Sequence, residues 1–408
     1  MDISIQKSKL LNFQKVQITG SKSESNRLLL LKALYPHISI ENVSNSDDSV
    51  LMQKALASKE EVIDIHHAGT AMRFLTAYFS IQKNRETIIT GSPRMKERPI
   101  KILVDALRTL GADITYLEND GFPPLKVKGQ EFTISKVTLE ANVSSQYISA
   151  LLLIASKLEN GLELTLKGKI TSVPYINMTL SLLNSIGIET SFVENTISVK
   201  PNTASLEAQT LTVESDWSSA SYFYSVIALS DVGTEITIAS YKDKSLQGDS
   251  VLADIYEKFG VTTTFFNQEI KLQKTKAITA ASLIELDLSN APDIAQTIAV
   301  TAFGLGLESY MVGLHTLKIK ETDRLVALKT ELEKLGAEVV ITDASLHLKP
   351  SVAIKNNITI ATYNDHRMAM AFAPLALKVP ISIENADVVS KSYPQFWDDF
   401  KAIGFNIK

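Results

Sequence analysis

Hydrophobic positions along the chain recur in one layout, in which a short stretch of polar or small residues opens an apolar, helix-like run. Six segments share it, namely SESNRLLLLKAL, GTAMRFLTAYF, SSQYISALLLIA, SSASYFYSVIAL, PDIAQTIAVTAF and DHRMAMAFAPLAL. They begin at Ser23, Gly69, Ser144, Ser218, Pro292 and Asp365. Successive starts lie about 73 to 75 residues apart, except for a first interval of about 46, and such regular spacing indicates an internal repeat.

A second series of segments interleaves with the first. Each is an amphipathic helix pattern that ends at a glycine and is followed by a strand-like run; the glycines are Gly111, Gly187, Gly260, Gly336 and Gly404. Glycine suits the left-handed position that closes a helix. Alternating strand patterns lie between the helices, at 87–90, 211–215, 234–240, 347–350 and 381–386. The two series together predict six copies of a unit with two helices and several strands, three copies in each domain.

Composition sets the outer limits of this interpretation. A chain of 408 residues exceeds one ordinary core and fits two domains. The net charge of −4 does not favour nucleic acid or an anionic membrane as a partner. The absence of cysteine excludes disulfides, thiolate metal sites and a cysteine nucleophile. No apolar stretch approaches the roughly 20 residues of a membrane span, and the start of the chain lacks a signal pattern, so we expect a cytoplasmic protein.

Cationic and small polar side chains gather where the predicted helices begin. The openings of the first series carry Lys22, Ser23 and Arg27; Gly69 and Arg73; Ser144, Ser145 and Gln146; and His366 and Arg367. Helices of the second series are preceded by Arg98, by Lys320, Glu321 and Arg324, and by Lys391. We expect Lys320 and Arg324, four residues apart, to share one helical face. Helix N-termini carry partial positive charge and unpaired N–H groups, so added cations predict sites for phosphate or carboxylate.

Several of these segments carry a family resemblance. SKSESNR, AGTAMR, PRMKERPI, SSQ, SVPYI, APDIAQTIA, IKETDRL, DHRMAMAFA and KSYPQF occur in the order found in the 5-enolpyruvylshikimate-3-phosphate synthase family, from Ser21 to Phe396. The resemblance implies an α/β (α+β) fold of two domains, the enolpyruvyl transferase fold. Each domain would hold three βαβαββ-type units around a pseudo-threefold axis, in an arrangement like an inside-out α/β barrel. We expect residues 1–20 and 214–408 to form one domain and 21–213 an inserted domain, with the active site in the cleft between them.

The reaction implied by the resemblance is enolpyruvyl transfer. Phosphoenolpyruvate would give its enolpyruvyl group to the 5-hydroxyl of shikimate 3-phosphate and release phosphate, through a tetrahedral addition–elimination intermediate. This step belongs to the shikimate pathway to chorismate and the aromatic amino acids. The family needs no cofactor and no metal, and it suggests a monomer whose partners are these two small molecules, not nucleic acid or a membrane.

The resemblance also carries residue roles. Shikimate 3-phosphate would be bound by Lys22, Ser23, Arg27, Ser144, Ser145, Gln146, Ser172, Tyr175, Asp293 and Lys320. Phosphoenolpyruvate would be bound by Lys22, Gly69, Arg98, Gln146, Arg324, Arg367 and Lys391. Asp293 would be the base toward the 5-hydroxyl, and Glu321 the proton donor to the methylene carbon. Lys22 would neutralise the leaving phosphate oxygen, and His366 would orient Glu321 or shuttle a proton.

Three positions depart from the family pattern. His67 and Phe74 replace an asparagine and a proline around the second helix opening, and Thr316 replaces an asparagine four residues before Lys320. The short first repeat is a fourth departure. It predicts that the first unit has lost a hairpin or strand pair on its outer face, away from the cleft.

Alternatives to this interpretation come from several classes. Taken singly, each residue is more typical of a capped helix or a surface ion pair, so the functional case rests on the whole set. The sister enzyme that acts on a UDP-sugar usually carries a reactive cysteine, which this chain lacks. A degenerate paralogue that binds phosphorylated ligands without turnover is a rival that the three substitutions favour; phosphate release that requires both substrates would discriminate. A P-loop kinase is disfavoured because GxxxxGK[ST] is absent.

Overall fold

The computed structural model describes residues 1–140, 144–168, 170, 173–202, 207–278 and 283–408. The chain divides into two compact units, each of which is described by itself. Unit 1 consists of Met1–Thr19 and Glu214–Lys408, and unit 2 of Gly20–Val213. Ser172, one of the predicted ligand-binding residues, lies outside the described residues.

Unit 2 contains two complete repeats with the same order of elements. The first consists of β4 (Val62–Asp64), α3 (Gly69–Ser80), β5 (Glu86–Thr90), the short α4 (Pro93–Lys96), α5 (Lys101–Leu110), β6 (Asp113–Tyr116) and β7 (Leu125–Lys128). The second consists of β8 (Lys136–Glu140), α6 (Ser145–Ala155), β9 (Leu162–Lys167), α7 (Val173–Ser185), β10 (Thr190–Val193) and β11 (Thr196–Val199). Their sheets run β4-β5-β7-β6 and β8-β9-β11-β10. In both, the first two strands are parallel and the others antiparallel, as the βαβαββ prediction requires.

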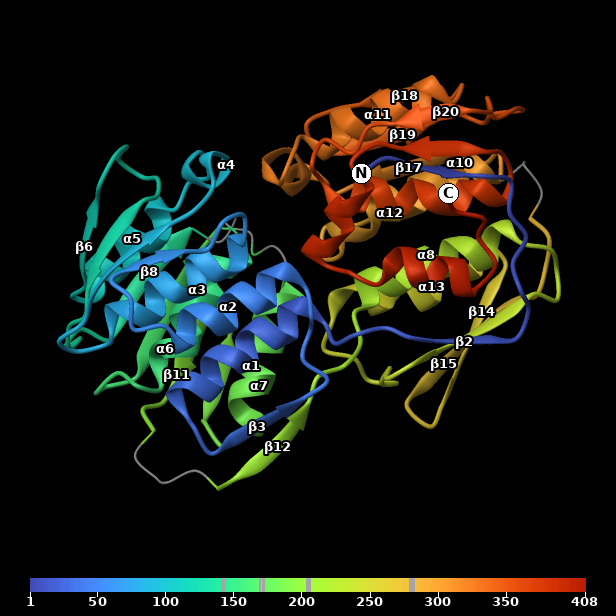
Figure 1. Cartoon of the computed structure of the whole chain (residues 1–408). Helices are drawn as coiled ribbons and strands as arrows, with labels where there is room; N and C mark the ends of the chain where they lie inside the picture. The colour runs from blue at the N-terminus through green and yellow to red at the C-terminus, as the bar shows by residue number, and fades with distance from the viewer. Residues whose placement is uncertain (141–143, 169, 171–172, 203–206, 279–282) are drawn as a thin grey trace. The chain divides into compact units, whose positions relative to one another are not determined.

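The remaining repeat of unit 2 is smaller. It consists of α1 (Lys22–Leu34), β3 (Ile38–Glu41), α2 (Asp47–Ala57) and β12 (Gln209–Thr212), a strand that the chain supplies as it leaves the unit. β3 and β12 form a two-stranded parallel sheet, visible side by side in Figure 1. Among the described residues this repeat therefore has two strands where its neighbours have four, which confirms the predicted loss of a strand pair.

Unit 1 repeats the same order. One repeat consists of β2 (Gln14–Gln17), α8 (Trp217–Leu229), β13 (Glu235–Ala239), the 3₁₀ turn η1 (Gly248–Val251), α9 (Leu252–Glu257), β14 (Val261–Phe266) and β15 (Glu269–Lys274). The next consists of β16 (Ile284–Asp287), η2 (Pro292–Ile294), α10 (Ala295–Gly304), β17 (Ser309–Val312), η3 (His315–Ile319), α11 (Arg324–Lys334), β18 (Val339–Ile341) and β19 (Ser345–Leu348). Their sheets run β2-β13-β15-β14 and β16-β17-β19-β18, the strand order of unit 2.

The last repeat of unit 1 is completed by both chain ends, which lie close together in Figure 1. It consists of β20 (Ile358–Ile360), α12 (His366–Phe372), η4 (Ala373–Leu377), β21 (Ile381–Ile383), η5 (Ala386–Lys391), α13 (Phe396–Ala402) and β1 (Ile3–Ile5). β1 pairs with β21, and Ile5 forms a bridge to Ile407. The backbone N–H of Ser4 donates to the carbonyl of Lys408 at 3.0 Å. The sheet of this repeat thus takes one of its strands from the opposite end of the chain.

The helices of the first series are the buried ones. Every residue of α3 is buried, and α6, α8, α10 and α12 are almost as enclosed. A helix that is apolar on all sides belongs inside a core, which explains why these segments show no polar stripe. The five glycines of the second series all have positive φ, between 76° and 119°, as their helix-closing position requires.

The strand predictions were correct in place, and 87–90 ends where β5 ends, but the other four extend past the C-terminal ends of their strands. β12 ends at Thr212, β19 at Leu348 and β21 at Ile383. No helix among the described residues is long and apolar enough to cross a membrane.

Candidate active site

Helix openings of unit 2 contact each other in two pairs. Gln146 Nε2, at the start of α6, donates to Thr70 Oγ1 at the start of α3, at 3.3 Å. Arg27, in the second turn of α1, donates from Nη2 to the carbonyl of Tyr175, in the first turn of α7, at 3.4 Å. The opening of α6 is therefore joined to that of α3, and α1 to the opening of α7, by side chains that the sequence predicted to be ligands. Ser144, the N-cap of α6, is exposed and Ser145 half-buried.

Arg27 is buried and is held by neutral oxygens. Its Nε donates to Thr179 Oγ1 at 2.8 Å, its Nη1 to the carbonyl of Ser23 at 2.8 Å, and its Nη2 to Ser149 Oγ at 2.9 Å. Burial lowers the pKa of Arg27 to about 10, because the opposing charge of Glu24 offsets only part of the loss of solvent. The side chain predicted to bind shikimate 3-phosphate thus also links α1 to α6 and α7.

A second group of cations surrounds the start of α3. Arg73 donates from Nη1 to the carbonyl of Gly69 at 2.9 Å and from Nη2 to that of Pro99 at 3.3 Å. Burial, and then the like charge of Arg98, lower the pKa of Arg73 to about 10. A Cβ on Gly69 would lie 2.5 Å from Arg98 Nη1, so glycine is what lets this guanidinium reach the helix backbone. Two arginines therefore face one helix opening, and an anion there would relieve their repulsion.

Lys22 opens α1 close to the start of α2. Its Nζ lies 3.5 Å from Asp48 Oδ1, and about a fifth of the side chain is exposed. His67 Nε2 lies 3.8 Å from Asp47 Oδ2, and His66 Nδ1 lies 2.7 Å from His67 Nδ1. The histidine that departs from the family pattern is thus placed beside the acidic first turn of α2.

Unit 1 holds a different cluster, centred on Asp293 in η2. Arg324 Nη1 lies 2.9 Å and Lys320 Nζ 3.3 Å from Asp293 Oδ1, while Arg367 Nη2 lies 3.2 Å from Oδ2. Burial alone would raise the pKa of Asp293, but the three cations outweigh it and hold the pKa well below its usual range. The carboxylate is thus ionised at neutral pH, with 17% of its side chain exposed.

Arg324 is surrounded by carboxylates. Besides Asp293, its Nε donates to Asp365 Oδ2 at 2.6 Å and its Nη2 to Glu321 Oε2 at 2.8 Å. Only 2% of the side chain is exposed. Burial would lower the pKa of Arg324, yet the carboxylates raise it above its ordinary value. Asp293 and Glu321, the predicted base and acid, therefore share one guanidinium.

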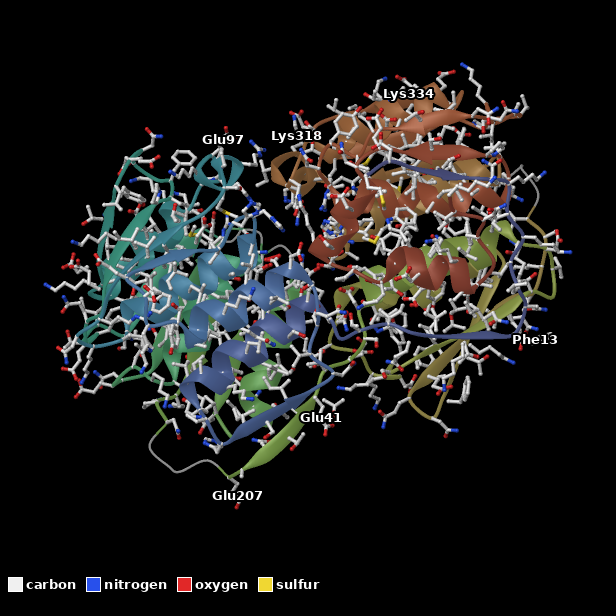
Figure 2. All side chains as sticks on the ribbon, viewed as in Figure 1. Phe13, Glu41, Glu97, Glu207, Lys318 and Lys334 are labelled. Carbon is white, nitrogen blue, oxygen red and sulfur yellow. The ribbon has the colours of Figure 1, made fainter. Side chains whose placement is uncertain are left out.

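The prediction that Lys320 and Arg324 share a helical face is wrong. Lys320 follows the 3₁₀ turn η3 with an extended backbone, and α11 begins only at Arg324. Asp323 caps that helix by accepting from the N–H groups of Leu325 and Val326 at 3.1 and 3.2 Å. Because the N-cap residue lies outside the helix, α11 begins after Asp323 and does not include Lys320. Figure 2 labels Lys318 and Lys334, which lie near the two ends of this η3–α11 segment.

Three other predicted residues lie around this cluster. His366 is buried at the start of α12, with Nδ1 at 3.9 Å from Asp365 Oδ1. Lys391 ends η5, and its Nζ donates to the carbonyl of Asn364 at 2.6 Å. Thr316 lies in η3, and its Oγ1 is buried without a hydrogen-bond partner among the described residues. The roles of His366 and Lys391 stay predictions.

The sequence interpretation missed several groups of these clusters. Asp365 was seen only as the start of a helix, although it is fully buried against Arg324. Asp48 was not considered, although it faces Lys22. Ser218 and Asp249 lie behind Arg367, and nothing local in the sequence marked Asp249. The N-cap position of Asp365 was the only local pattern that could have marked one of these residues, and an N-cap pattern does not predict which cation the carboxylate contacts.

Comparison with known proteins identifies the family of the chain. Residues 52–400 match the family described as EPSP synthase (3-phosphoshikimate 1-carboxyvinyltransferase). The 3-phosphoshikimate 1-carboxyvinyltransferase of Bacteroides fragilis is 47% identical over 398 residues, covering 96% of both chains. The protein of the same name from Haemophilus influenzae is 36% identical over 423 residues, covering 95% of this chain and 96% of the relative.

Solved structures agree on the fold. A structure of EPSP synthase from Acinetobacter baumannii superposes with a TM-score of 0.81 at 20% identity, covering 100% of this chain and 99% of the other. The enolpyruvyl transferase NikO from Streptomyces tendae superposes with a TM-score of 0.75 at 15% identity, covering 100% and 98%. These likenesses establish the enolpyruvyl transferase fold with its repeated four-stranded sheets.

Proposed function

The chain belongs to the EPSP synthase family, and from this membership we infer how its two charged clusters divide the work of enolpyruvyl transfer. Its activity is that of a 3-phosphoshikimate 1-carboxyvinyltransferase of the shikimate pathway, whose substrates are phosphoenolpyruvate and shikimate 3-phosphate. Both substrates are anionic, which suits a protein with local groups of cations and an overall charge of −4.

We propose that the two clusters bind the same pair of substrates. Shikimate 3-phosphate would contact Lys22, Ser23, Arg27, Ser144, Ser145, Gln146, Ser172 and Tyr175 from unit 2, and Asp293 and Lys320 from unit 1. Phosphoenolpyruvate would contact Lys22, Gly69, Arg98 and Gln146 from unit 2, and Arg324, Arg367 and Lys391 from unit 1. Guanidinium groups match carboxylate and phosphate oxygens in pairs, and serine hydroxyls at a helix opening suit a phosphate.

The proton traffic is assigned to the two carboxylates around Arg324. Asp293 would take the proton of the 5-hydroxyl as its oxygen bonds to C2 of phosphoenolpyruvate, while Glu321 gives a proton to C3. The product of this addition is a tetrahedral intermediate. Its bond to phosphate then breaks, a methyl proton returns to a carboxylate, and the new enol double bond forms. Lys22 would stabilise the charge that develops on the departing phosphate, and His366 would orient Glu321 or carry its proton.

The low pKa of Asp293 implies that substrate binding precedes proton transfer to this residue. Three cations make Asp293 a weak base in the described structure, because they stabilise its ionised form. Phosphate and carboxylate groups bound to Lys320, Arg324 and Arg367 would share those charges and raise the pKa of Asp293. The base would therefore become effective only when both substrates are in place.

The observation that supports this proposal is the joint contact of Asp293 and Glu321 with Arg324. The test is Asp293→Ala, with phosphate release measured in the presence of both substrates and of each alone. We expect turnover to fall by about 10²–10⁴-fold, the usual contribution of a positioned acid or base. The exposed Asp231→Ala provides a matched control with unchanged turnover. A near-normal rate in Asp293→Ala would remove this carboxylate from the mechanism.

Two further expectations concern the protein as a whole. We propose that the enzyme is cytoplasmic and monomeric. Its bacterial relatives and the lack of a membrane-spanning helix among the described residues support the first part. Each unit closing its own three repeats supports the second. Sedimentation of the purified protein, with and without both substrates, tests the oligomeric state.

A further inference from the structure

A line of polar groups runs from Arg367 in unit 1, and it begins at the same guanidinium nitrogen that contacts Asp293. Arg367 Nη2 donates to Ser218 Oγ at 3.3 Å, and Ser218 Oγ donates in turn to Asp249 Oδ2. The same Arg367 nitrogen lies 3.2 Å from Asp293 Oδ2. The guanidinium is therefore held between the predicted catalytic base and a second carboxylate that it reaches through a hydroxyl.

The burial of Asp249 is not explained by local structure. The residue lies in η1, only 3% of it is exposed, and its Oδ1 has no hydrogen-bond partner among the described residues. It does not cap η1, since the N-cap residue is Gln247. A buried carboxylate without a direct cation contact is costly to the fold. Asp249 is the last acceptor in a chain of hydrogen bonds from Arg367, which indicates a role in holding that arginine.

We propose that Asp249 is a positioning residue for Arg367, which it acts on through Ser218, and that it thereby sets the affinity for phosphoenolpyruvate. The inference rests on the proposed role of Arg367 as a ligand of that substrate. With Asp249 ionised, hydrogen bonds point one way, from guanidinium to hydroxyl to carboxylate. This fixed direction holds the plane of the Arg367 guanidinium, whose remaining N–H groups are then aimed at the substrate.

The charges around Asp249 predict when this line weakens. Burial is the main cause that raises the pKa of Asp249 to about 6, and the negative charges of Asp293 and Asp216 add to it. Arg367 and the hydrogen bond from Ser218 act in the opposite direction. Asp249 therefore takes up a proton as the pH falls through about 6, and the line loses its terminal charged acceptor.

The experiment compares Asp249→Asn and Ser218→Ala with the native enzyme in steady-state kinetics from pH 5 to pH 8. At pH 8 we expect either change to raise KM for phosphoenolpyruvate about tenfold, the effect of losing one hydrogen bond to a charged group, with a smaller change in kcat. Phosphate esters themselves titrate near pH 6, so the quantity compared is the ratio of variant KM to native KM at each pH. That ratio should fall toward 1 below pH 6, where the native Asp249 is already protonated.

The controls separate this inference from the proposed function. Asp254→Asn changes an exposed carboxylate of the adjacent α9 and should leave KM unaltered at every pH. Arg367→Ala tests the ligand role alone: an unaltered KM for phosphoenolpyruvate there would refute that role and not the contact with Asp249. If Arg367→Ala raises KM, a ratio for Asp249→Asn that stays near 1, or that exceeds 1 equally at all pH values, overturns the positioning role. Should Asp249→Asn fail to fold, the same ratio for Ser218→Ala decides the matter.

Discussion

The two units of the molecule are built alike but hold their arginines in opposite ways. In unit 2, Arg27 and Arg73 are bound by hydroxyls and carbonyls, and the pKa of each is lowered to about 10. In unit 1, Arg324 and Arg367 are bound by carboxylates, and their pKa values are raised. All four side chains are buried, so the difference comes from their partners and not from their exposure.

This difference affects how strongly each group of cations attracts an anionic ligand. Cations whose hydrogen-bond partners are neutral oxygens keep more of their attraction, because the carboxylates near them, such as Glu24 and Asp48, offset only part of the effect of burial. Cations supported by carboxylates are already balanced, so a substrate anion that binds them has to share them with those carboxylates. A single repeated architecture thus holds its arginines with two kinds of partner, through different side chains around its helix openings.

The largest effect expected from breaking this contrast is on stability. Arg324→Met leaves the fully buried Asp365 without its charge partner, and we expect a loss of about 3–5 kcal/mol in the free energy of unfolding. Arg27→Met removes hydrogen bonds to neutral oxygens, and Ser149 and Thr179 still bond each other at 2.9 Å. The expected loss there is about 1–3 kcal/mol. Urea unfolding of the two variants measures both quantities.

Equal losses in the two variants would contradict the contrast between the units. Asp365→Asn in the background of Arg324→Met sharpens the test, since it removes the stranded charge. The double variant should recover part of the stability lost by Arg324→Met. No recovery would show that the cost comes from lost packing and not from an uncompensated carboxylate.

The second effect concerns the pH dependence of stability in unit 1. The pKa of Asp249 is raised to about 6 from an ordinary value near 3.8, so its protonation favours the fold. The resulting stabilisation is complete below that ordinary value and is lost as the pH rises through about 6. We expect Asp249→Asn to gain about 2.5 kcal/mol relative to the native protein between pH 4 and pH 7.5, measured by urea unfolding.

The contribution of Asp293 in the same unit depends on pH in the opposite direction. Its pKa is lowered, so its stabilisation is present above the ordinary range and is lost only as the pH falls below that range. Comparing Asp249→Asn with the native protein at each pH removes this contribution, because Asp293 is present in both. A difference that does not change with pH would refute the raised pKa of Asp249.

The features that sequence predicted well depend on local rules. The six helix openings and the five closing glycines are marked by cap residues, apolar runs and the freedom of glycine, all within a few residues of one another. The two-stranded first repeat was predicted from a single short interval, since a repeat that lacks about 28 residues lacks a strand pair. The fold and the number of repeats could therefore be predicted from the sequence.

The ion-pair partners of the buried arginines could not be predicted from such local rules. Arg324 pairs with Asp293 and Asp365, which lie 31 and 41 residues away along the chain. Which carboxylate meets which guanidinium depends on the packing of α10, α11 and α12, and no periodicity specifies that. The helical face proposed for Lys320 and Arg324 failed for a related reason, because the N-cap at Asp323 outweighed the spacing rule.

The smallest expected effect compares one helix glycine from each unit. Gly304→Ala in α10 would place a Cβ 2.6 Å from Leu229 and 2.9 Å from Leu375, and overpacking of this kind costs about 1–3 kcal/mol. Gly69→Ala in α3 meets instead the flexible end of Arg98, so stability should change by about 0.5 kcal/mol or less. The displaced guanidinium should raise KM for phosphoenolpyruvate, whereas Gly304→Ala should leave it unaltered. Kinetics and urea unfolding on both variants decide this, and a KM that is raised in Gly304→Ala but unaltered in Gly69→Ala would contradict the proposed role of Gly69.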